Sequence, residues 1–170
     1  SLRQVIRDYL HSARGVHCRP EQILVGAGSE YLLMLLSQLI GRSTGIALEN
    51  PTYKQAFRVF ESLGHPIFPV SMDEWGMKVK ELEKTQARIA YVMPSHQYPT
   101  GIVIPIKRRQ ELLKWAKKQE GRYLIEDDYD SEFRYKGRPI PALQGMDDSQ
   151  KVIYMGTFSR SIAPAIRVGF

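Results

Sequence analysis

The chain of 170 residues contains a single cysteine, Cys18, which excludes an internal disulfide and a metal site built from several thiolates. No run approaches the roughly 18 apolar residues of a membrane span, and the first residues do not resemble a signal peptide. These absences predict a cytoplasmic protein that does not enter the membrane.

Three familiar motifs are also missing from the sequence. The dinucleotide fingerprint G-x-G-x-x-G has its first two glycines at Gly26 and Gly28, but Tyr31 occupies the third place. There is no G-x-x-x-x-G-K-[ST] loop and no G-x-S-x-G elbow. The sequence therefore disfavours nucleoside triphosphate binding and serine-based hydrolysis.

The net charge is +6, and much of it lies in residues 106–122. An apolar stripe of Leu112, Leu113, Trp115 and Ala116 predicts a helix there. The basic residues are interpreted as its solvated face rather than a nucleic-acid surface, because aromatic side chains are not interleaved with them. These residues are Lys107, Arg108, Arg109, Lys114, Lys117 and Lys118.

Short apolar runs alternate with amphipathic segments along the chain. Strands are predicted at residues 22–26, 45–50, 65–70, 87–94, 122–127, 151–156 and 165–170. Helices are predicted at residues 1–10, 28–41, 51–64, 79–85 and 106–122, the first with Leu2, Val5, Ile6, Tyr9 and Leu10 on one side. Continuous apolar strands indicate cover on both faces, so we predict a three-layer αβα domain with a mostly parallel, doubly wound sheet.

Polar or aromatic turns follow five of these strands, and ligands bind beyond the carboxyl ends of strands in such sheets. The turns are "GAGSE", "NPTY", "PSHQYPTG", "DDYD" and "GTFSR". Gly28 and Ser29 open a helix and predict either a phosphate site or a tight turn with a serine cap. Tyr53 is placed to stack on a flat ring, or to pack in the core, and His96 offers a donor.

The acidic turn places Glu126, Asp127, Asp128 and Asp130 around Tyr129. Strand alternation puts Asp127 and Tyr129 on one face and Asp128 on the other. A carboxylate there needs a partner, which a magnesium ion, an arginine or a protonated ring nitrogen would supply. An acidic loop with capping aspartates remains the plain alternative. A phosphate site, a flat ring and a carboxylate together suggest pyridoxal phosphate.

The sequence resembles a known family in five stretches: residues 2–36, "ENPTY", "VMPSHQYPTG", "LIEDDYDSEFRYKGRPIPALQG" and "IYMGTFSRSIAPAIRVGF". They are similar to the aminotransferase-like domain of MocR-type regulators of the GntR superfamily. That resemblance implies part of the large domain of a fold-type I pyridoxal phosphate protein, with residues 1–170 as a truncated domain. It also implies a winged-helix DNA-binding domain, a C-terminal small domain and a homodimer in the full-length protein.

The resemblance also implies roles for individual residues. Gly28, Ser29 and the backbone of Glu30 correspond to part of the phosphate cup, with Thr157, Ser159 and Arg167 as further phosphate ligands. Tyr53 corresponds to the ring-stacking aromatic, Asp127 to the partner of the pyridine nitrogen, Tyr129 to the partner of the ring oxygen, and His96 to a residue beside the ring. Tyr98 stands where many aminotransferases have asparagine, which removes one contact to that oxygen.

One position departs from the family pattern. The family has a lysine after "GTFS" that forms the Schiff base with the cofactor, whereas this chain has Arg160. A guanidinium stays protonated, with a pKa above about 12, and does not replace an amine nucleophile. Lys151 is nine residues away, roughly 30 Å along a strand. The chain is therefore predicted to hold the cofactor without a covalent bond and to be inactive.

Three functions follow from these observations. The first is the cofactor-binding part of a MocR-type regulator that senses an amine or amino acid and binds DNA through another domain. The second is part of an amino acid aminotransferase, against which Arg160 counts. The third is a magnesium-dependent α/β enzyme built on the Asp127 cluster, which leaves Tyr53 and the phosphate site without a role.

Overall fold

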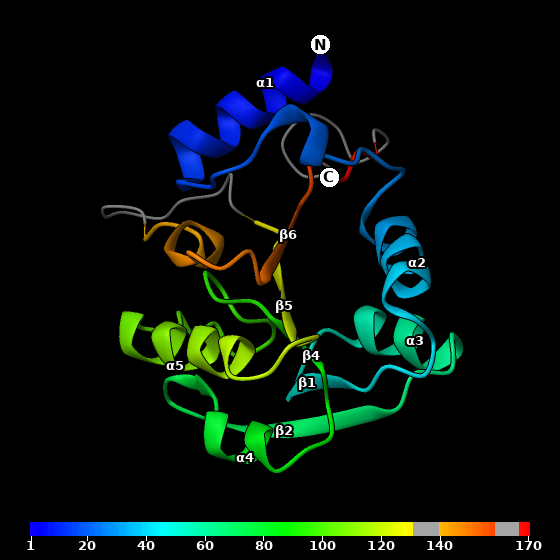
Figure 1. Ribbon diagram of the computed structural model, residues 1–170, viewed down its shortest axis with the longest axis vertical. Helices are drawn as coiled ribbons and strands as arrows, with labels where there is room; N and C mark the ends of the chain where they lie inside the picture. The colour runs from blue at the N-terminus through cyan, green and yellow to red at the C-terminus, as the bar shows by residue number, and fades with distance from the viewer. Residues whose placement is uncertain (131–139, 159–166) are drawn as a thin grey trace.

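The computed structural model describes residues 1–130, 140–158 and 167–170. Within them lies a six-stranded sheet with the order β3-β2-β1-β4-β5-β6 (Figure 1). The strands are β1 (Ile46–Asn50), β2 (Ile67–Asp73), β3 (Gly76–Met77), β4 (Ile89–Val92), β5 (Tyr123–Asp128) and β6 (Val152–Gly156). β3 pairs antiparallel with β2, and the other pairs are parallel, so the predicted mostly parallel sheet is confirmed.

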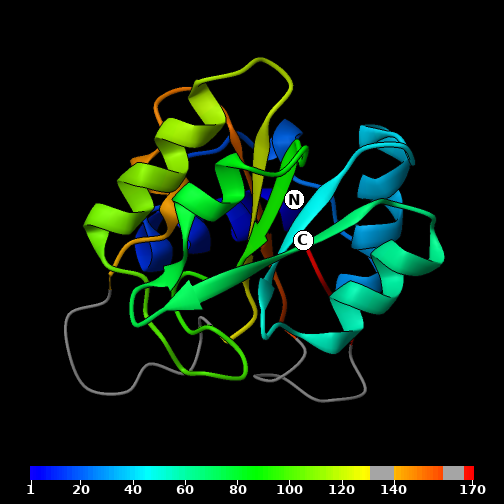
Figure 2. The same cartoon turned by 90° about the horizontal axis from the view of Figure 1, so that it is seen from below.

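Helices cover both faces of the sheet, as the view in Figure 2 shows. One face carries α2 (Ser29–Ile40) and α3 (Lys54–Ser62), and the other carries α4 (Val79–Glu83), α5 (Ile106–Lys117) and the 3-10 turn Leu143–Met146. α1 (Leu2–Tyr9), with the π-turn Leu10–Arg14 and the 3-10 turn Pro20–Gln22, lies beside β6. The predicted three-layer αβα architecture is therefore confirmed. No helix of the described residues is long and apolar enough to cross a membrane.

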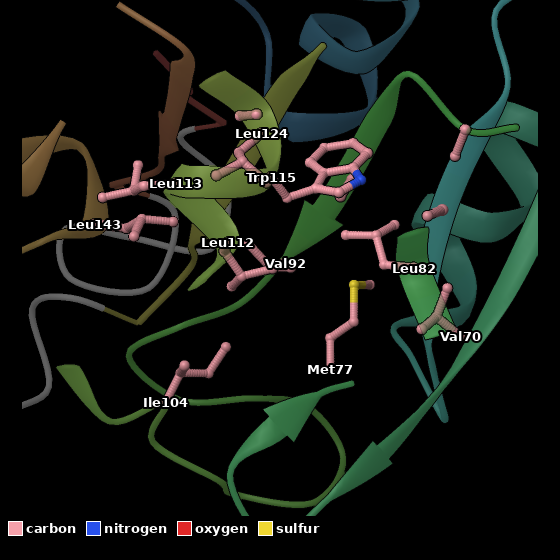
Figure 3. Packing of buried hydrophobic residues seen from close by; sticks show 14 residues of the cluster. Val70, Met77, Leu82, Val92, Ile104, Leu112, Leu113, Trp115, Leu124 and Leu143 are labelled. Atoms are coloured by element: carbon pink, nitrogen blue, oxygen red, sulfur yellow. The ribbon is translucent and has the colours of Figure 1, made fainter. Parts of the chain in front are cut away.

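Two apolar clusters explain why the strands read as continuous hydrophobic runs. On the α5 face, Trp115 and Leu112 pack with Val92 and Leu124 (Figure 3). On the opposite face, Phe60 of α3 packs in a second cluster with strand residues such as Ile46 and Ile125. Successive strand side chains point to opposite faces, so each strand needs apolar residues at every position to fill both clusters.

The first helix buries less of its apolar side than predicted. Ile6 and Leu10 are buried, but Leu2 is 56% exposed and Val5 is 65% exposed. α1 therefore contacts the edge of the domain mainly through Ile6 and Leu10, which lie one helical turn apart and pack in a small cluster with Val16. The helical region ends at Gly15, which follows the π-turn in a left-handed conformation with φ of 65°.

The prediction that every basic residue of α5 faces solvent is wrong for two arginines. Arg109 is buried and donates to the carbonyl oxygens of Ile104 at 2.7 Å and Pro141 at 2.8 Å. Arg108 is buried and pairs with Asp73 at 2.8 Å. Buried guanidinium groups persist here because carbonyl and carboxylate oxygens satisfy their donors. The four lysines are exposed, as predicted.

Residues 22–26 do not form the predicted strand. The segment has one antiparallel bridge, from Gly26 to Gly169, and Gly169 also bridges to Thr157. Phe170 exchanges both main-chain hydrogen bonds with Gly156. A strand ladder needs several successive paired residues, whereas Gly26 alone among residues 22–26 pairs with the described part of the C-terminal segment. Of the predicted strand 165–170, residues 165 and 166 lie outside the described residues.

Candidate functional site

A cavity of about 370 Å³ opens at the carboxyl ends of the central strands. It gathers residues from all five predicted turns and from the C-terminal segment, although they are distant in sequence. Seven predicted site residues line it: Gly28, Ser29, Tyr53, Asp127, Tyr129, Thr157 and Arg167. Parallel strands bring their following turns to one edge, so the topology itself assembles this site.

The acidic turn divides its carboxylates between the two faces of the sheet. Asp127 and Tyr129 line the cavity. Glu126 faces the other way and accepts from the backbone nitrogens of Leu143 at 2.7 Å and Gln144 at 2.8 Å. The predicted alternation of faces is therefore confirmed, and Glu126 lies on the opposite face of the strand from Asp127.

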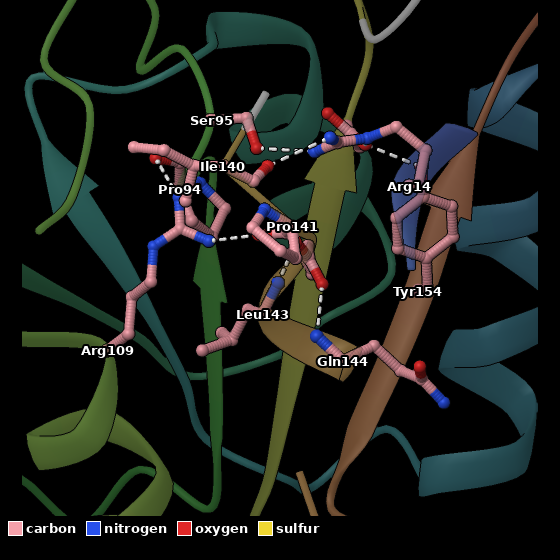
Figure 4. A network of polar contacts seen from close by, with 11 residues as sticks. Arg14, Pro94, Ser95, Arg109, Ile140, Pro141, Leu143, Gln144 and Tyr154 are labelled. Atoms are coloured by element: carbon pink, nitrogen blue, oxygen red, sulfur yellow. Dashed lines mark hydrogen bonds and ion pairs between the residues drawn. The ribbon is translucent and has the colours of Figure 1, made fainter. Parts of the chain in front are cut away.

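Asp128 belongs to a buried polar network on the face away from the cavity (Figure 4). Arg14, from the end of the π-turn, donates to Asp128 Oδ2, and Tyr154 of β6 donates to the same oxygen. Arg14 also donates to Ser95 Oγ at 2.8 Å and to the carbonyl oxygen of Ile140 at 3.0 Å. This one guanidinium thus ties the N-terminal helix to three segments around the site.

The start of α2 and Arg167 form an anion-attracting wall of the cavity. Gly28 precedes α2 with φ of 93°, and a Cβ there would lie 3.2 Å from Arg167 Nε. Glycine therefore allows the guanidinium to approach the helix N-terminus. The first backbone N–H groups of a helix lack partners within the helix, and its dipole attracts negative charge. Ser29 and Thr157 add hydroxyl groups to the same cavity.

Two tyrosines form an aromatic part of the wall. Tyr53 precedes α3, and its ring meets that of Tyr98 edge-on, with centroids 5.9 Å apart and planes at 90°. Tyr53 is 39% exposed, which is unusual for a large aromatic that serves only as core. Rings placed in this way present a flat face or an edge to a planar ligand.

Two predicted residues are near the cavity without lining it. His96 Nδ1 lies 2.5 Å from Asp130 Oδ2, and the His96 ring stacks on Tyr129 with centroids 6.1 Å apart. The carboxylate of Glu30, in the first turn of α2, accepts from Gln55 Nε2 at 2.7 Å. Ser159 and Arg160 lie outside the described residues.

Sequence reasoning missed Tyr91, whose hydroxyl donates to Asp127 Oδ2. Tyr91 is fully buried in β4 and packs edge-on against Phe60. A tyrosine in the apolar run "IAYVM" is most simply interpreted as a core residue. Only the pairing of β4 with β5 brings its hydroxyl to the carboxylate of Asp127. No local signal in the sequence marks this contact.

Burial shapes the protonation of the carboxylates at this edge. Loss of solvation raises the pKa of Asp127 to about 6, although the hydrogen bond from Tyr91 acts to lower it. Burial likewise raises the pKa of Glu126 to about 7. Asp127 is therefore largely ionised at neutral pH, as acceptance of a hydrogen bond from a protonated nitrogen requires.

A second residue missed by sequence reasoning is Glu49, buried at the end of β1. It accepts from the backbone nitrogen of Met93, which lines the cavity, at 3.1 Å. Burial raises the pKa of Glu49 to about 8, against the lowering effect of that hydrogen bond. Glu49 thus joins the ends of β1 and β4 beneath the cavity, and its ionisation opposes folding.

We expect the free energy of unfolding to fall by about 2 kcal/mol between pH 5 and pH 7 through Glu49 alone. Folding raises the pKa of Glu49, so the neutral side chain contributes its full stabilisation below the unfolded pKa of 4.5. This stabilisation is lost as pH rises toward and through the folded pKa of about 8. Urea unfolding of wild type and Glu49→Gln measures the difference against pH. Glu61→Gln, at an exposed position of α3, is the control. Parallel pH profiles for wild type and Glu49→Gln would contradict the expectation.

Comparisons with known proteins place this geometry in context. The family model described as "Aminotransferase class I and II" matches residues 1–170. The uncharacterized HTH-type transcriptional regulator YdeL of Bacillus subtilis is 44% identical over 99% of this chain and 36% of its own length. The probable rhizopine catabolism regulatory protein MocR of Rhizobium meliloti is 36% identical over 99% of this chain and 34% of its own length.

A solved structure shows the same fold. The α-aminoadipate aminotransferase LysN of Thermus thermophilus, complexed with N-(5'-phosphopyridoxyl)-L-leucine, superposes with a TM-score of 0.86. It is 28% identical over 99% of this chain and 43% of its own length. The chain spans about a third of the length of the curated regulators that it matches.

Proposed function

The chain belongs to the aminotransferase class I and II family, and from this membership we propose that it is the pyridoxal-phosphate-binding part of a MocR-type transcription regulator. The expected fold class and the resemblance to MocR-type regulators are both confirmed. The observation that carries the proposal is one cavity that joins an anion-attracting wall at Gly28 and Arg167 to a buried carboxylate, Asp127.

The described residues fit the cofactor without a covalent bond. The N-terminus of α2, with Ser29, Thr157 and Arg167, would hold the phosphate. Asp127 would accept from the pyridine nitrogen, and Tyr53 would pack against the ring. When bound, pyridoxal phosphate supplies an electron-withdrawing ring. Covalent attachment does not fit, because residue 160 is an arginine rather than a lysine.

A regulatory role accommodates this departure more readily than transamination does. An enzyme of this family needs an amine as nucleophile and as base for proton transfer, and arginine serves neither purpose. A regulator needs binding that depends on an amine or amino acid effector. Binding of DNA through another domain, assembly as a homodimer and a cytoplasmic location belong to this proposal for the full-length protein.

Two alternatives are less well supported. The aminotransferase alternative draws on the similarity to LysN, but Arg160 counts against it. The magnesium alternative needs several carboxylates at one point, whereas Glu126 and Asp128 face away from Asp127 into contacts of their own. Among the described residues, no group of three or more His, Cys, Asp or Glu side chains is placed to hold a metal ion.

Titration with pyridoxal phosphate, with pyridoxal and with magnesium tests the proposal. We expect Arg167→Gln to weaken the binding of pyridoxal phosphate about tenfold or more, because a charged hydrogen bond to phosphate is lost. The binding of pyridoxal, which lacks the phosphate, should change less than twofold. Absorbance of the cofactor and quenching of protein fluorescence report the affinities.

Arg58→Gln, at an exposed position of α3, is the matched control and should leave both affinities unchanged. Equal affinity of the wild-type chain for pyridoxal and its phosphate would remove the phosphate site from the proposal. If the chain binds magnesium tightly and does not bind pyridoxal phosphate, the magnesium alternative replaces the proposed function.

A further inference from the structure

Asp127 lines the cavity, and Tyr91 contacts it from behind, inside the domain. Tyr91 lies in β4, which pairs with β5, and its hydroxyl donates to Asp127 Oδ2 from the interior of the domain. Tyr91 is fully buried, and its ring is held by Phe60 at a centroid distance of 6.1 Å. A buried phenol fixed in this way has little freedom to choose another acceptor.

Because Tyr91 donates this hydrogen bond, Asp127 is available as an acceptor for a ligand that donates a hydrogen bond. Burial, together with the nearby carboxylate of Asp127, raises the pKa of Tyr91 well above its usual value, so the phenol keeps its proton and acts as a donor. An ionised carboxylate accepts on both oxygens. Donation from Tyr91 to one oxygen therefore favours the ionised form and leaves acceptor capacity for a donor inside the cavity.

We propose that Tyr91 is a positioning residue that holds Asp127 ionised and oriented, so that the cavity selects a protonated aromatic nitrogen over a ring that lacks one. This inference rests on the proposed function. Tyr91 touches neither the cavity nor the ligand, because it is not among the lining residues and acts through Asp127 alone.

Other charged groups around this pair influence its titration. Asp128 and Asp130, on the same strand and turn, act to raise the pKa of Asp127. Glu49, from β1, acts on Tyr91 and raises its pKa. Arg167 is a cation of the same cavity. The hydrogen bond from Tyr91 lowers the pKa of Asp127, so removal of this hydroxyl raises the pH at which Asp127 ionises.

The test compares pyridoxal phosphate with its carbocyclic analogue, in which a C–H group replaces the ring nitrogen. Both carry the same phosphate and aldehyde, so the ratio of their affinities isolates the ring nitrogen. We expect wild type to prefer the nitrogen-containing compound at pH 7.5 and Tyr91→Phe to lose about tenfold of this preference. The midpoint of the preference against pH should also move upward in Tyr91→Phe.

Tyr154→Phe is the matched control, because it removes a phenolic hydroxyl from Asp128 on the opposite face. It should leave the preference and its midpoint unchanged. Tyr91→His keeps a donor and should retain most of the preference, which preserves the test if Tyr91→Phe does not fold. An unchanged preference in Tyr91→Phe, or its loss in Tyr91→His, would overturn the inference.

The outcomes also separate this inference from the proposed function. Wild type that binds both compounds equally, through their phosphate, overturns the role of Tyr91 and leaves the phosphate site intact. Wild type that binds neither compound overturns the proposed function and the inference with it. A preference that vanishes in Asp127→Asn and weakens in Tyr91→Phe supports both.

Discussion

Replacing Arg160 by lysine is expected to give the chain a covalently held cofactor, whereas the chain itself should hold none. A lysine amine in a cavity of this kind attacks the aldehyde of pyridoxal phosphate, and a guanidinium that stays protonated does not. Gly156 and Thr157, which precede residue 160 by three to four positions in the sequence, line the cavity. Borohydride treatment, followed by mass spectrometry of the intact protein, measures the attachment.

Arg58→Lys is the control for this experiment, because it adds the same amine at an exposed position of α3. Peptide mapping should locate the adduct at residue 160 in Arg160→Lys. An adduct at an equal level in the unaltered chain would show that another amine reaches the cofactor. The absence of any adduct in Arg160→Lys, despite binding of the cofactor, would contradict the assignment of this position.

Removal of the Arg14 guanidinium is expected to destabilise the domain by about 3–5 kcal/mol. Arg14 is 1% exposed, and Arg14→Met leaves Asp128 as a buried carboxylate without its cationic partner. The free energy of unfolding, measured in urea, should therefore fall by a large fraction of the roughly 5–15 kcal/mol of an ordinary domain. The bonds to Ser95 and Ile140 are lost in the same variant.

The double variant Arg14→Met with Asp128→Leu should recover at least about half of that loss, because no uncompensated charge remains. Arg7→Met is the control, since Arg7 and Asp8 form an exposed pair whose removal should cost less than about 1 kcal/mol. A double variant no more stable than Arg14→Met would show that the hydrogen bonds of Arg14 to Ser95 and Ile140, rather than the buried charge of Asp128, account for the loss.

Much of the site was predictable because its signals are local. A glycine before a helix, a tyrosine after a strand and an aspartate at a strand end each follow from neighbouring residues. The alternation of strand side chains correctly placed Asp127 and Asp128 on opposite faces. The common edge of parallel strands then brought these turns together without further information.

The incorrect predictions all concern contacts between segments distant in sequence. Arg109 reads as a solvated basic residue, yet it is buried because carbonyl groups from two loops converge on it. Val5 reads as part of a buried stripe, yet it faces solvent because α1 lies at the domain edge. Residues 22–26 read as a strand, yet their described pairing is a single bridge from Gly26.

The order of apolar runs and turns in the chain is enough to define an αβα domain with polar and aromatic turns at one edge, because hydrophobic periodicity and turn chemistry act over a few residues. The sequence also shows directly that an arginine, Arg160, follows the "GTFS" stretch. The partners of the buried polar groups depend on the tertiary structure. Tyr91 meets Asp127, and Arg14 meets Asp128, only when strands and loops far apart in the chain pack together, since a buried polar group takes whichever partner packing brings to it.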